Sequence, residues 1–234
     1  TILFALGFTR EKIIETFYTV SKYSYQTASK NWITDFNPEN YKRPIKLSYD
    51  LIDGKTNKKI LSKGEKLNIV IAKKLHEKGL NSILLSNEQV VGSYIAKEIK
   101  EKSGEVLLGA GFDITEEVLT KIIDQEEKDL YIVNIDPINK GPYILETLKI
   151  DKNINKAEGL NDIYKVLRPG EAPSIEIAED VFNNLYFKKE RYDLSEVGRV
   201  KLNSKLNLNT STKKTTLETE DIVAIIKFML DLRD

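Results

Sequence analysis

The chain has 234 residues, of which 41% are hydrophobic, so we expect a folded protein with a sizeable buried core. Lysine plus arginine and aspartate plus glutamate both number 36, and this balance gives no overall field that would select nucleic acid or an anionic membrane. The absence of cysteine and the presence of one histidine, His76, exclude disulfides, thiolate nucleophiles and the usual zinc ligand sets, and they fit a reducing cytoplasm.

Neither end of the chain predicts a membrane or export segment. No apolar run approaches the roughly 18 residues that a membrane helix requires. The opening residues, TILFALGFTREK, lack the basic start and small-residue cleavage site of a signal peptide. The chain begins without methionine, inside an apolar segment, and ends on a predicted helix, so we expect a fragment of a longer polypeptide.

The first predicted element is a helix over residues 10–19. Thr9 is placed as its N-cap, Glu11 lies in its first turn, and apolar residues recur at helical spacing. Short β-branched strands, glycine-containing turns and amphipathic helices then alternate over residues 21–140. We expect this part to be a separate αβ domain, joined to the rest by connectors over residues 23–31 and 138–141.

Within residues 21–140 the sequence resembles itself. DGKTNKKILSKGEKLNIVIAKKL, residues 53–75, aligns with KSGEVLLGAGFDITEEVLTKII, residues 102–123, at an offset of 47. The matched pairs are Gly64 with Gly111, Leu67 with Ile114, Ile71 with Val118, and Leu75 with Ile122. An apolar strand follows each predicted helix, NSILLS in one copy and LYIVNI in the other. The repeat predicts two similar strand-helix-strand units packed on one another.

After residues 141–142 the chain is dominated by long amphipathic helices. They are predicted over residues 160–167, 175–187 and 220–232, with Ser174 as the N-cap of the second. Between the last two helices lie a basic stretch and the polar run NTSTKKTT, which is typical of a mobile loop. Residues 187–214 hold eight basic and three acidic residues, a net charge of +5. This asymmetry suits a phosphate backbone, although a solvated basic face is the commoner cause of such a run.

The segment VLRPGEAPS, residues 166–174, ends one helix and starts the next. Pro169 stops the first helix and Gly170 supplies a turn, so Arg168 stands at the edge of a constrained loop. Its side chain could bind a phosphate with little extra backbone ordering. It could equally interact with the helix dipole or pair with Glu171. The residues alone leave both roles open.

No catalytic motif accompanies these features. The sequence has no GxxxxGK loop, HExxH, serine elbow or aspartate cluster for two magnesium ions, so we expect this chain alone to catalyse nothing. We interpret His76 as a surface residue, and the adjacent pairs Glu116–Glu117 and Glu126–Glu127 as solvated helix residues.

Aromatic residues near the basic stretch are candidates for stacking on unpaired bases, but most are expected in the core. Tyr192, beside Arg191, is the one best placed for a nucleic-acid role. Trp32, the single tryptophan, is expected to pack against the first repeat unit. The expected core aromatics are Tyr164, Phe182, Tyr186 and Phe187.

The C-terminal motifs resemble the bacterial RNA polymerase β subunit. GPYILETLKID (141–151), IYKVLRPGEAPSIEIAEDVFNNLYF (163–187), RYDLSEVGRVKLN (191–203) and DIVAIIKFMLDLRD (221–234) follow in the order seen in that family. ALGFTREKIIETFY, residues 5–18, resembles the segment upstream of them. The chain looks like the lobe domain of this subunit, with residues 21–140 similar to the insertion that some bacterial lineages carry there.

This resemblance implies an α+β fold: a mainly helical lobe domain, residues 1–20 and 141–234, interrupted by an αβ insertion domain, residues 21–140. It implies a non-catalytic part of DNA-directed RNA polymerase, a cytoplasmic, nucleoid-associated nucleotidyltransferase whose metal ligands lie on another subunit, and no cofactor in this chain. The implied partners are the β′, α and σ subunits and promoter and downstream DNA. The implied DNA contacts are Arg168, Arg191, Arg199 and Lys201, with Arg168 on the non-template strand near the start site.

Two other functions compete with DNA contact. In family members that carry the insertion, it touches DksA-type regulators, so residues 21–140 could serve as a protein-interaction module beside the DNA-facing lobe. A stand-alone αβ protein that binds a small molecule would need a pocket with convergent polar groups, which no motif in the sequence proposes.

Overall fold

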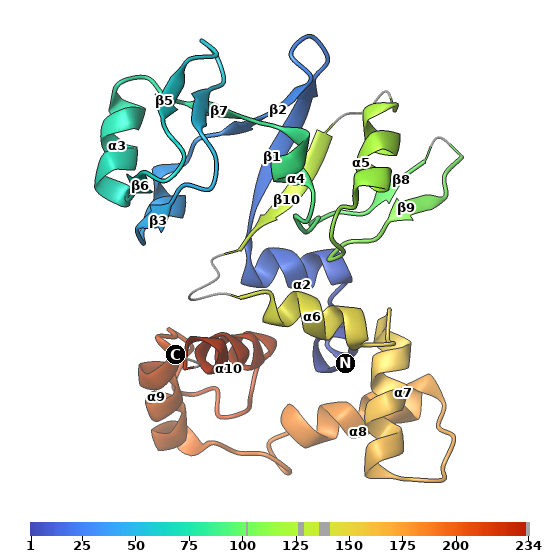
Figure 1. Cartoon of the computed structure of the whole chain (residues 1–234). Coiled ribbons are helices and arrows are strands. Elements are labelled where there is room, and N and C mark those ends of the chain that lie inside the picture. The colour runs from blue at the N-terminus through green and yellow to red at the C-terminus, as the bar shows by residue number, and fades with distance from the viewer. Residues whose placement is uncertain (102, 126–128, 136–140, 233–234) are drawn as a thin grey trace. The chain divides into compact units, whose positions relative to one another are not determined.

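The computed structural model describes residues 1–101, 103–125, 129–135 and 141–232, and it is a mixed helix and sheet fold of the α+β class (Figure 1). The chain divides into two compact units. We call Thr1–Phe17 with Asp136–Asp234 the helical unit, and Tyr18–Ile135 the sheet unit. The predicted boundary at residue 140 and most of the predicted connector 138–141 lie outside the described residues, and the assignment to a lobe and an insertion stays a prediction.

The helical unit consists of α1 (Ile2–Ala5), α2 (Arg10–Phe17), α6 (Tyr143–Ile150), α7 (Lys156–Leu167), α8 (Ile175–Tyr186), α9 (Ser195–Leu206) and α10 (Thr219–Asp231). Helix α1 packs on α7, α7 on α8, α2 on α6, and α9 on α10. The predicted N-cap of α8 is confirmed, because the Ser174 hydroxyl accepts a hydrogen bond from the Ile177 N–H. Helix α2 ends at Phe17, earlier than predicted, because β-branched Thr19 and Val20 begin a strand.

Helix α9 has no counterpart in the sequence prediction. Its apolar residues do not line a buried face, since Val197 is 65% and Val200 51% exposed, while the buried residue of this helix is Arg199. Hydrophobic periodicity therefore gives no signal for this helix.

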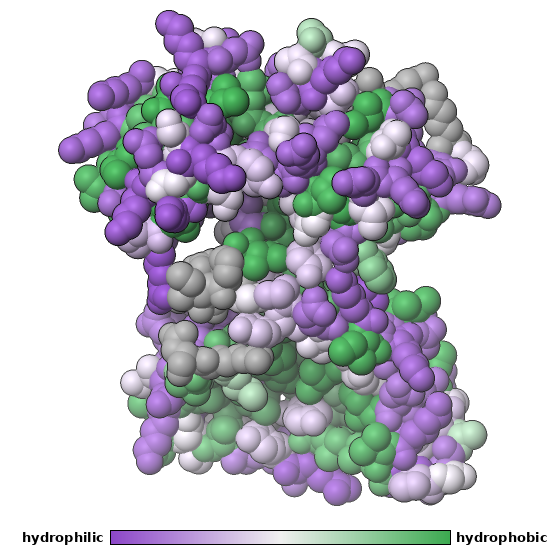
Figure 2. Space-filling model, viewed as in Figure 1, coloured by the Kyte–Doolittle hydropathy of each residue, from purple (hydrophilic) through white to green (hydrophobic). Residues whose placement is uncertain are grey.

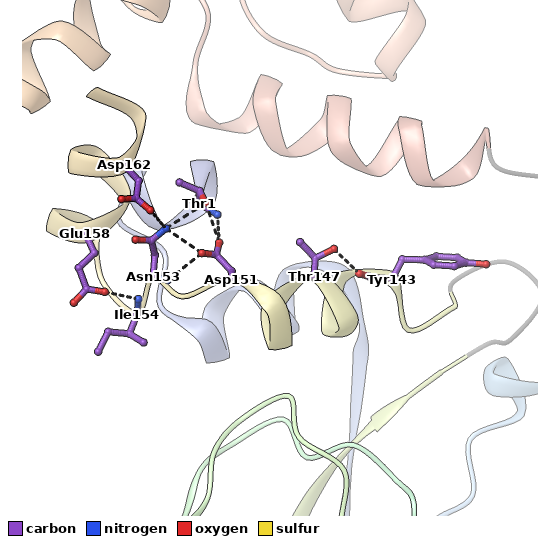
Figure 3. Close-up of polar contacts among 8 residues, drawn as sticks. All are labelled: Thr1, Tyr143, Thr147, Asp151, Asn153, Ile154, Glu158 and Asp162. Carbon is purple, nitrogen blue, oxygen red and sulfur yellow. Dashed lines mark hydrogen bonds and ion pairs between the residues drawn. The ribbon is translucent and has the colours of Figure 1, made fainter. Parts of the chain in front are cut away.

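A buried asparagine fixes the connection between α6 and α7 (Figure 3). The Asn153 side-chain amide donates to Asp151 Oδ1 and to Asp162 Oδ2, each at 3.0 Å. Next to it, the Ile154 N–H donates to Glu158 Oε2 at 2.9 Å. Because Asp151 is the C-cap of α6 and the two acidic partners lie on α7, these bonds set the turn between the helices.

The sheet unit contains one six-stranded antiparallel sheet in the order β10-β1-β2-β7-β4-β5. Its strands are β1 (Thr19–Gln26), β2 (Asn31–Asp35), β4 (Leu51–Asp53), β5 (Lys59–Leu61), β7 (Ser82–Leu85) and β10 (Asp129–Asn134). Two small sheets pair β3 (Ile45–Lys46) with β6 (Lys66–Leu67), and β8 (Ile99–Lys100) with β9 (Val106–Leu108). The helices are η1 (Pro38–Tyr41), α3 (Ile69–Glu77), α4 (Asn87–Val90) and α5 (Glu116–Ile123).

The two repeat copies have the predicted order of elements. One runs β5, α3, β7 and the other β9, α5, β10. Gly64 and Gly111 both adopt positive φ, +90° and +86°, a conformation that favours glycine. The helix N-caps also match at the same offset, because Asn68 Oδ1 accepts from Ile71 N–H and Thr115 Oγ1 from Val118 N–H. Of the acidic pairs, Glu116–Glu117 is exposed in the first turn of α5, and Glu126–Glu127 lies outside the described residues.

The prediction that the two copies pack on one another is wrong. Strands β7 and β10 belong to the same sheet, and the β1–β2 hairpin lies between them. This hairpin occupies residues 23–31, which were predicted to be a connector; β-branched and aromatic residues on both strands, such as Tyr25 opposite Trp32, favour pairing. At its far edge β1 pairs with β10, with Thr19 opposite Asn134.

Each copy has its own hydrophobic cluster. The first contains Phe36, Leu51, Leu67, Ala72, Leu80 and Ile83. Trp32, fully buried, belongs to the second, with residues such as Ile95, Ile114 and Leu130, so it packs against the second copy and not the first as predicted. Its indole N–H donates to Asn87 Oδ1 at 3.0 Å, which satisfies the one polar group that the ring buries.

We predict that Gly159→Ala destabilises the chain by about 1–3 kcal/mol, because α1 crosses α7 at this glycine. An added Cβ would lie 2.9 Å from the Ala5 backbone nitrogen and 3.0 Å from the Thr1 carbonyl oxygen. Gly198→Ala, within α9, is the matched control: its Cβ would meet the Leu194 Cβ at 3.4 Å. Helix propensity should make that variant neutral or more stable by up to about 1 kcal/mol. Urea denaturation of both variants tests the packing, and equal effects would contradict it.

Candidate nucleic-acid interface

The basic stretch forms a turn, a helix and a loop in the helical unit. The chain leaves α8 and turns at Lys188, whose carbonyl accepts hydrogen bonds from the N–H groups of Arg191 and Tyr192 at 3.0 and 2.9 Å. Asp193 then prepares the start of α9: its carboxylate accepts from the Ser195 N–H at 2.9 Å, and this bond lowers the pKa of Asp193. The turn is therefore held by its backbone and leaves its cations free to face solvent.

Arg191 and Lys201 lie on this surface as exposed side chains, Arg191 in the turn and Lys201 on α9. Tyr192 is 41% exposed, as a stacking residue would need to be. Tyr164 and Phe182 are buried, and Tyr186 and Phe187 are packed against their cluster, so the expected placement of these four aromatics in the core is confirmed.

The structure gives Arg199 a role different from the predicted DNA contact. Its side chain is 0% exposed, and Nη1 donates to both carboxylate oxygens of Asp221, at 2.7 and 2.8 Å. Nε donates to the Lys214 carbonyl at 2.7 Å, and Nη2 donates to the Thr216 carbonyl. The guanidinium thus joins α9, α10 and the loop between them, and its burial keeps it away from any phosphate.

The loop between α9 and α10 is held in place by hydrogen bonds to its carbonyl groups, although its composition predicted mobility. Besides the two carbonyls bound by Arg199, the Thr210 carbonyl accepts from Asn203 Nδ2 at 2.6 Å. The Thr215 carbonyl accepts from the Leu194 N–H at 2.7 Å. A polar sequence is compatible with order here because neighbouring helices bind the loop's own carbonyl groups.

Arg168 stands at the C-cap of α7, before Pro169 and Gly170, the latter with φ +88°. Its side chain is 56% exposed, with Nη1 3.8 Å from Glu171 Oε2 and the guanidinium carbon 5.9 Å from the centre of the Tyr164 ring. Glu171 also accepts a hydrogen bond from the Tyr164 hydroxyl at 2.6 Å, which raises the pKa of that tyrosine. An exposed pair of this length contributes little, so Arg168 can leave Glu171 at small cost.

Arg168 and Arg191 are not brought into one cluster. Arg168 precedes α8 and Arg191 follows it, and this 12-residue helix is about 18 Å long. Exposed cations separated in this way suit an extended polyanion better than a small anionic ligand, since successive phosphates of a nucleic-acid strand are themselves spread along a line.

The described residues hold no group of three or more His, Asp or Glu side chains that could bind a metal ion. None of the helices within that part of the chain is long and apolar enough to cross a membrane. A hollow of about 420 Å³ lies in the helical unit between α1, α7, α8 and the start of α10. The Lys156–Glu179 ion pair, with its atoms 2.6 Å apart, lies on its wall.

The fold and this surface define a helical domain with exposed cationic turns, interrupted along the chain by an αβ unit. The chain belongs to the family RNA polymerase Rpb2, domain 2, which matches residues 108–234, more than half of it. The resemblance to bacterial RNA polymerase β subunits is thereby confirmed.

Curated relatives match the whole chain, including the sheet unit. DNA-directed RNA polymerase subunit beta of Agrobacterium fabrum is 42% identical over 235 residues, that of Rickettsia felis 40% over 235, and that of Cereibacter sphaeroides 39% over 246. Each alignment covers 100% of this chain and 17%, 17% and 18% of the relative, respectively. The chain therefore spans less than a fifth of the length of these relatives.

Asp221, buried beneath this surface, is the residue that sequence analysis missed. Its position in the first turn of a predicted helix is sufficiently explained by the helix dipole, so nothing in the sequence pointed to a buried partner 22 residues earlier.

We predict that Arg199→Ala lowers the free energy of unfolding by about 3–5 kcal/mol, because it leaves the Asp221 carboxylate buried without its guanidinium. The exposed neighbour on the same helix gives the matched control: Lys201→Ala should change it by less than about 0.5 kcal/mol. Replacing both partners with apolar residues, Arg199→Met with Asp221→Leu, should cost less than Arg199→Ala. Denaturation midpoints decide this, and a cost for Arg199→Ala no greater than for Lys201→Ala would refute the stabilising role of the buried ion pair.

Proposed function

We propose that this chain is part of the lobe of an RNA polymerase β subunit, lines the downstream DNA cleft and holds promoter DNA through phosphate contacts. The observation that carries the proposal is the exposure of Arg168, Arg191 and Lys201 on backbone that is fixed by caps and turns. Cations on fixed backbone lose little freedom when they bind a phosphate, and they read no base sequence.

The proposed DNA surface comprises these three cations with Tyr192. Arg199 acts through the loop that it holds and does not touch DNA. In the assembled enzyme, the neighbours of this lobe are the β′, α and σ subunits, with Arg168 on the non-template strand near the start site. The chain contributes no catalytic group to the nucleotidyltransferase, which works in the cytoplasm on the nucleoid.

We predict that Arg168→Ala, Arg191→Ala and Lys201→Ala each shorten the lifetime of promoter complexes in reconstituted polymerase. Each lost phosphate contact should lower the slope of log lifetime against log salt by roughly one unit, equally at different promoters. Lys165→Ala is the matched control, because Lys165 is exposed on the same helix that Arg168 ends and is not part of the proposed surface.

The capping role of Arg168 gives a different result in the same experiment. If Arg168 only interacts with the end of α7, its replacement should cost up to about 1 kcal/mol of stability and leave the complexes unchanged. Thermal unfolding of the variant measured beside its promoter lifetimes separates the two roles.

The sheet unit supports a second function, the docking of regulatory proteins. We infer that it is the lineage-specific insertion of the lobe and that DksA-type regulators bind it. The supporting observation is that each unit has a core of its own: among the described residues, the clusters around Trp32 and Leu67 contain residues of the sheet unit alone, and the cluster around Leu160 contains residues of the helical unit alone. A unit with its own core can present a surface without being needed for DNA contact.

We predict that replacing residues 18–135 with a short Gly-Ser linker in the full-length subunit leaves an assembled polymerase with normal promoter retention. The same replacement in the 234-residue chain should leave one cooperative thermal transition, because each unit has its own core. The response to DksA-type regulators should be lost. A polymerase that responds normally without the unit would contradict the docking function, and loss of the cooperative transition would contradict the independence of the units.

A further inference from the structure

The two repeat copies carry opposite charges. Residues 42–85 contain eleven lysines and arginines and four acidic residues, a net charge of +7. The equivalent residues of the second copy, 89–132, contain five basic and ten acidic residues, a net charge of −5. The order of strand, helix and strand that the copies share does not require this difference. The whole chain is neutral, so its composition conceals this separation.

All eleven cations of the first copy are exposed, and Figure 2 shows many hydrophilic side chains over this half of the sheet unit. Most of its acidic residues accept hydrogen bonds from backbone N–H groups. Asp50 accepts from the Lys63 N–H at 2.7 Å, Asp53 from the Lys55 N–H at 2.9 Å, and Glu65 from the Ser62 N–H at 2.6 Å. These bonds shape the turns of the first copy and leave a surplus of positive charge outside them.

Two of these cations belong to the ladder of β3 and β6, whose strands are labelled in Figure 1, and there Lys46 lies directly opposite Lys66. Like charges in directly opposite positions destabilise a strand pair. Within the described part of the chain, no ion pair joins either lysine to a carboxylate. The equivalent position to Lys66 in the second copy is Asp113, so the repeat itself does not impose a cation here. An arrangement that costs stability in the free chain is explained if an anion binds between the two ammonium groups.

An aromatic group lies near the lysines. Tyr49, three residues after Lys46, is 45% exposed, with the Lys63 ammonium 5.9 Å from its ring centre. Exposed apolar side chains beside unpaired cations suit a protein surface that offers both carboxylates and apolar contacts. A long nucleic acid is less suitable, because the net negative second copy shares the same sheet and would repel it.

We propose that the β3–β6 face, with Lys46 and Lys66 at its centre and Tyr49 beside them, binds an acidic, partly apolar surface of a protein partner. This inference rests on the proposed docking function of the sheet unit and adds the chemistry of the partner. The carboxylates of that partner neutralise the opposed lysines, and its apolar side chains cover Tyr49.

The test uses the 234-residue chain and three fluorescent probes: a 20-residue peptide of glutamate interspersed with leucine, an all-glutamate peptide of the same length, and a 20-base-pair DNA duplex. Anisotropy titrations should show the mixed peptide binding more tightly than the all-glutamate peptide. Lys66→Glu should lower the affinity for the mixed peptide about 3- to 10-fold and leave duplex binding unchanged. The same substitution should raise the melting temperature by about 1–3 °C, because it turns a repulsive cross-strand pair into an attractive one.

Two further variants make the result decisive. Lys46→Glu should reproduce both effects from the other strand, and Lys165→Glu, an equal charge change on the helical unit, should produce neither. The inference is overturned if Lys66→Glu and Lys46→Glu leave the affinity for the mixed peptide unchanged. It is also overturned if they lower the affinity for the duplex instead, which would make the face a nucleic-acid site. A third contrary outcome is self-association of the wild-type chain through this face in sedimentation, with which the peptides do not compete. Each of these outcomes is separate from loss of the regulator response on removing residues 18–135, which tests docking itself.

Discussion

The buried pair of Arg199 and Asp221 is the interaction on which the C-terminal part of the helical unit depends. Taking two charged groups out of water is costly, and their attraction offsets that cost only when the remaining donors are also satisfied. Here the guanidinium donates to the carboxylate and to two loop carbonyls, so the ion pair and the loop support one another. The Glu218 N–H, bonded to Asp221 Oδ2 at 2.8 Å, extends the same network to the start of α10. Lys201 is exposed on the same helix, α9, that this arrangement holds, whereas Arg199 itself is buried.

Sequence analysis was most successful where local chemistry determines the structure. Ser174 was identified as a helix cap because it satisfies a backbone donor of its own few residues. Gly64 and Gly111 were matched only as equivalent positions of the repeat, and their shared positive φ gives a local reason for the match. The equivalence of the two repeat copies could be recognised for the same reason. Each copy repeats the local signals of the other, and the spacing of their apolar residues needs no knowledge of the surroundings.

Predictions from the sequence were wrong where distant residues determine the local structure. Helix α9 has exposed valines and a buried arginine, so its pattern is explained only by Asp221 on another helix. The polar loop after it is ordered by hydrogen-bond donors from other elements. Trp32 packs against the second copy because the β1–β2 hairpin enters the sheet between β10 and β7. Of the candidate DNA contacts, Arg168, Arg191 and Lys201 are exposed and Arg199 is not, a distinction that charge counting along the chain cannot make.

The pairing of β1 with β10 has a consequence for how the helical unit folds. Because Thr19 lies opposite Asn134, the sheet unit begins and ends on neighbouring strands, although more than a hundred residues separate these points in sequence. A flexible segment of that length would oppose the meeting of α2 with α6 through the entropy of closing a long loop. Once the sheet unit has folded, the helical unit needs to close only a gap the width of adjacent strands. An order of events in which the interrupting unit forms first therefore favours assembly of the domain that it interrupts.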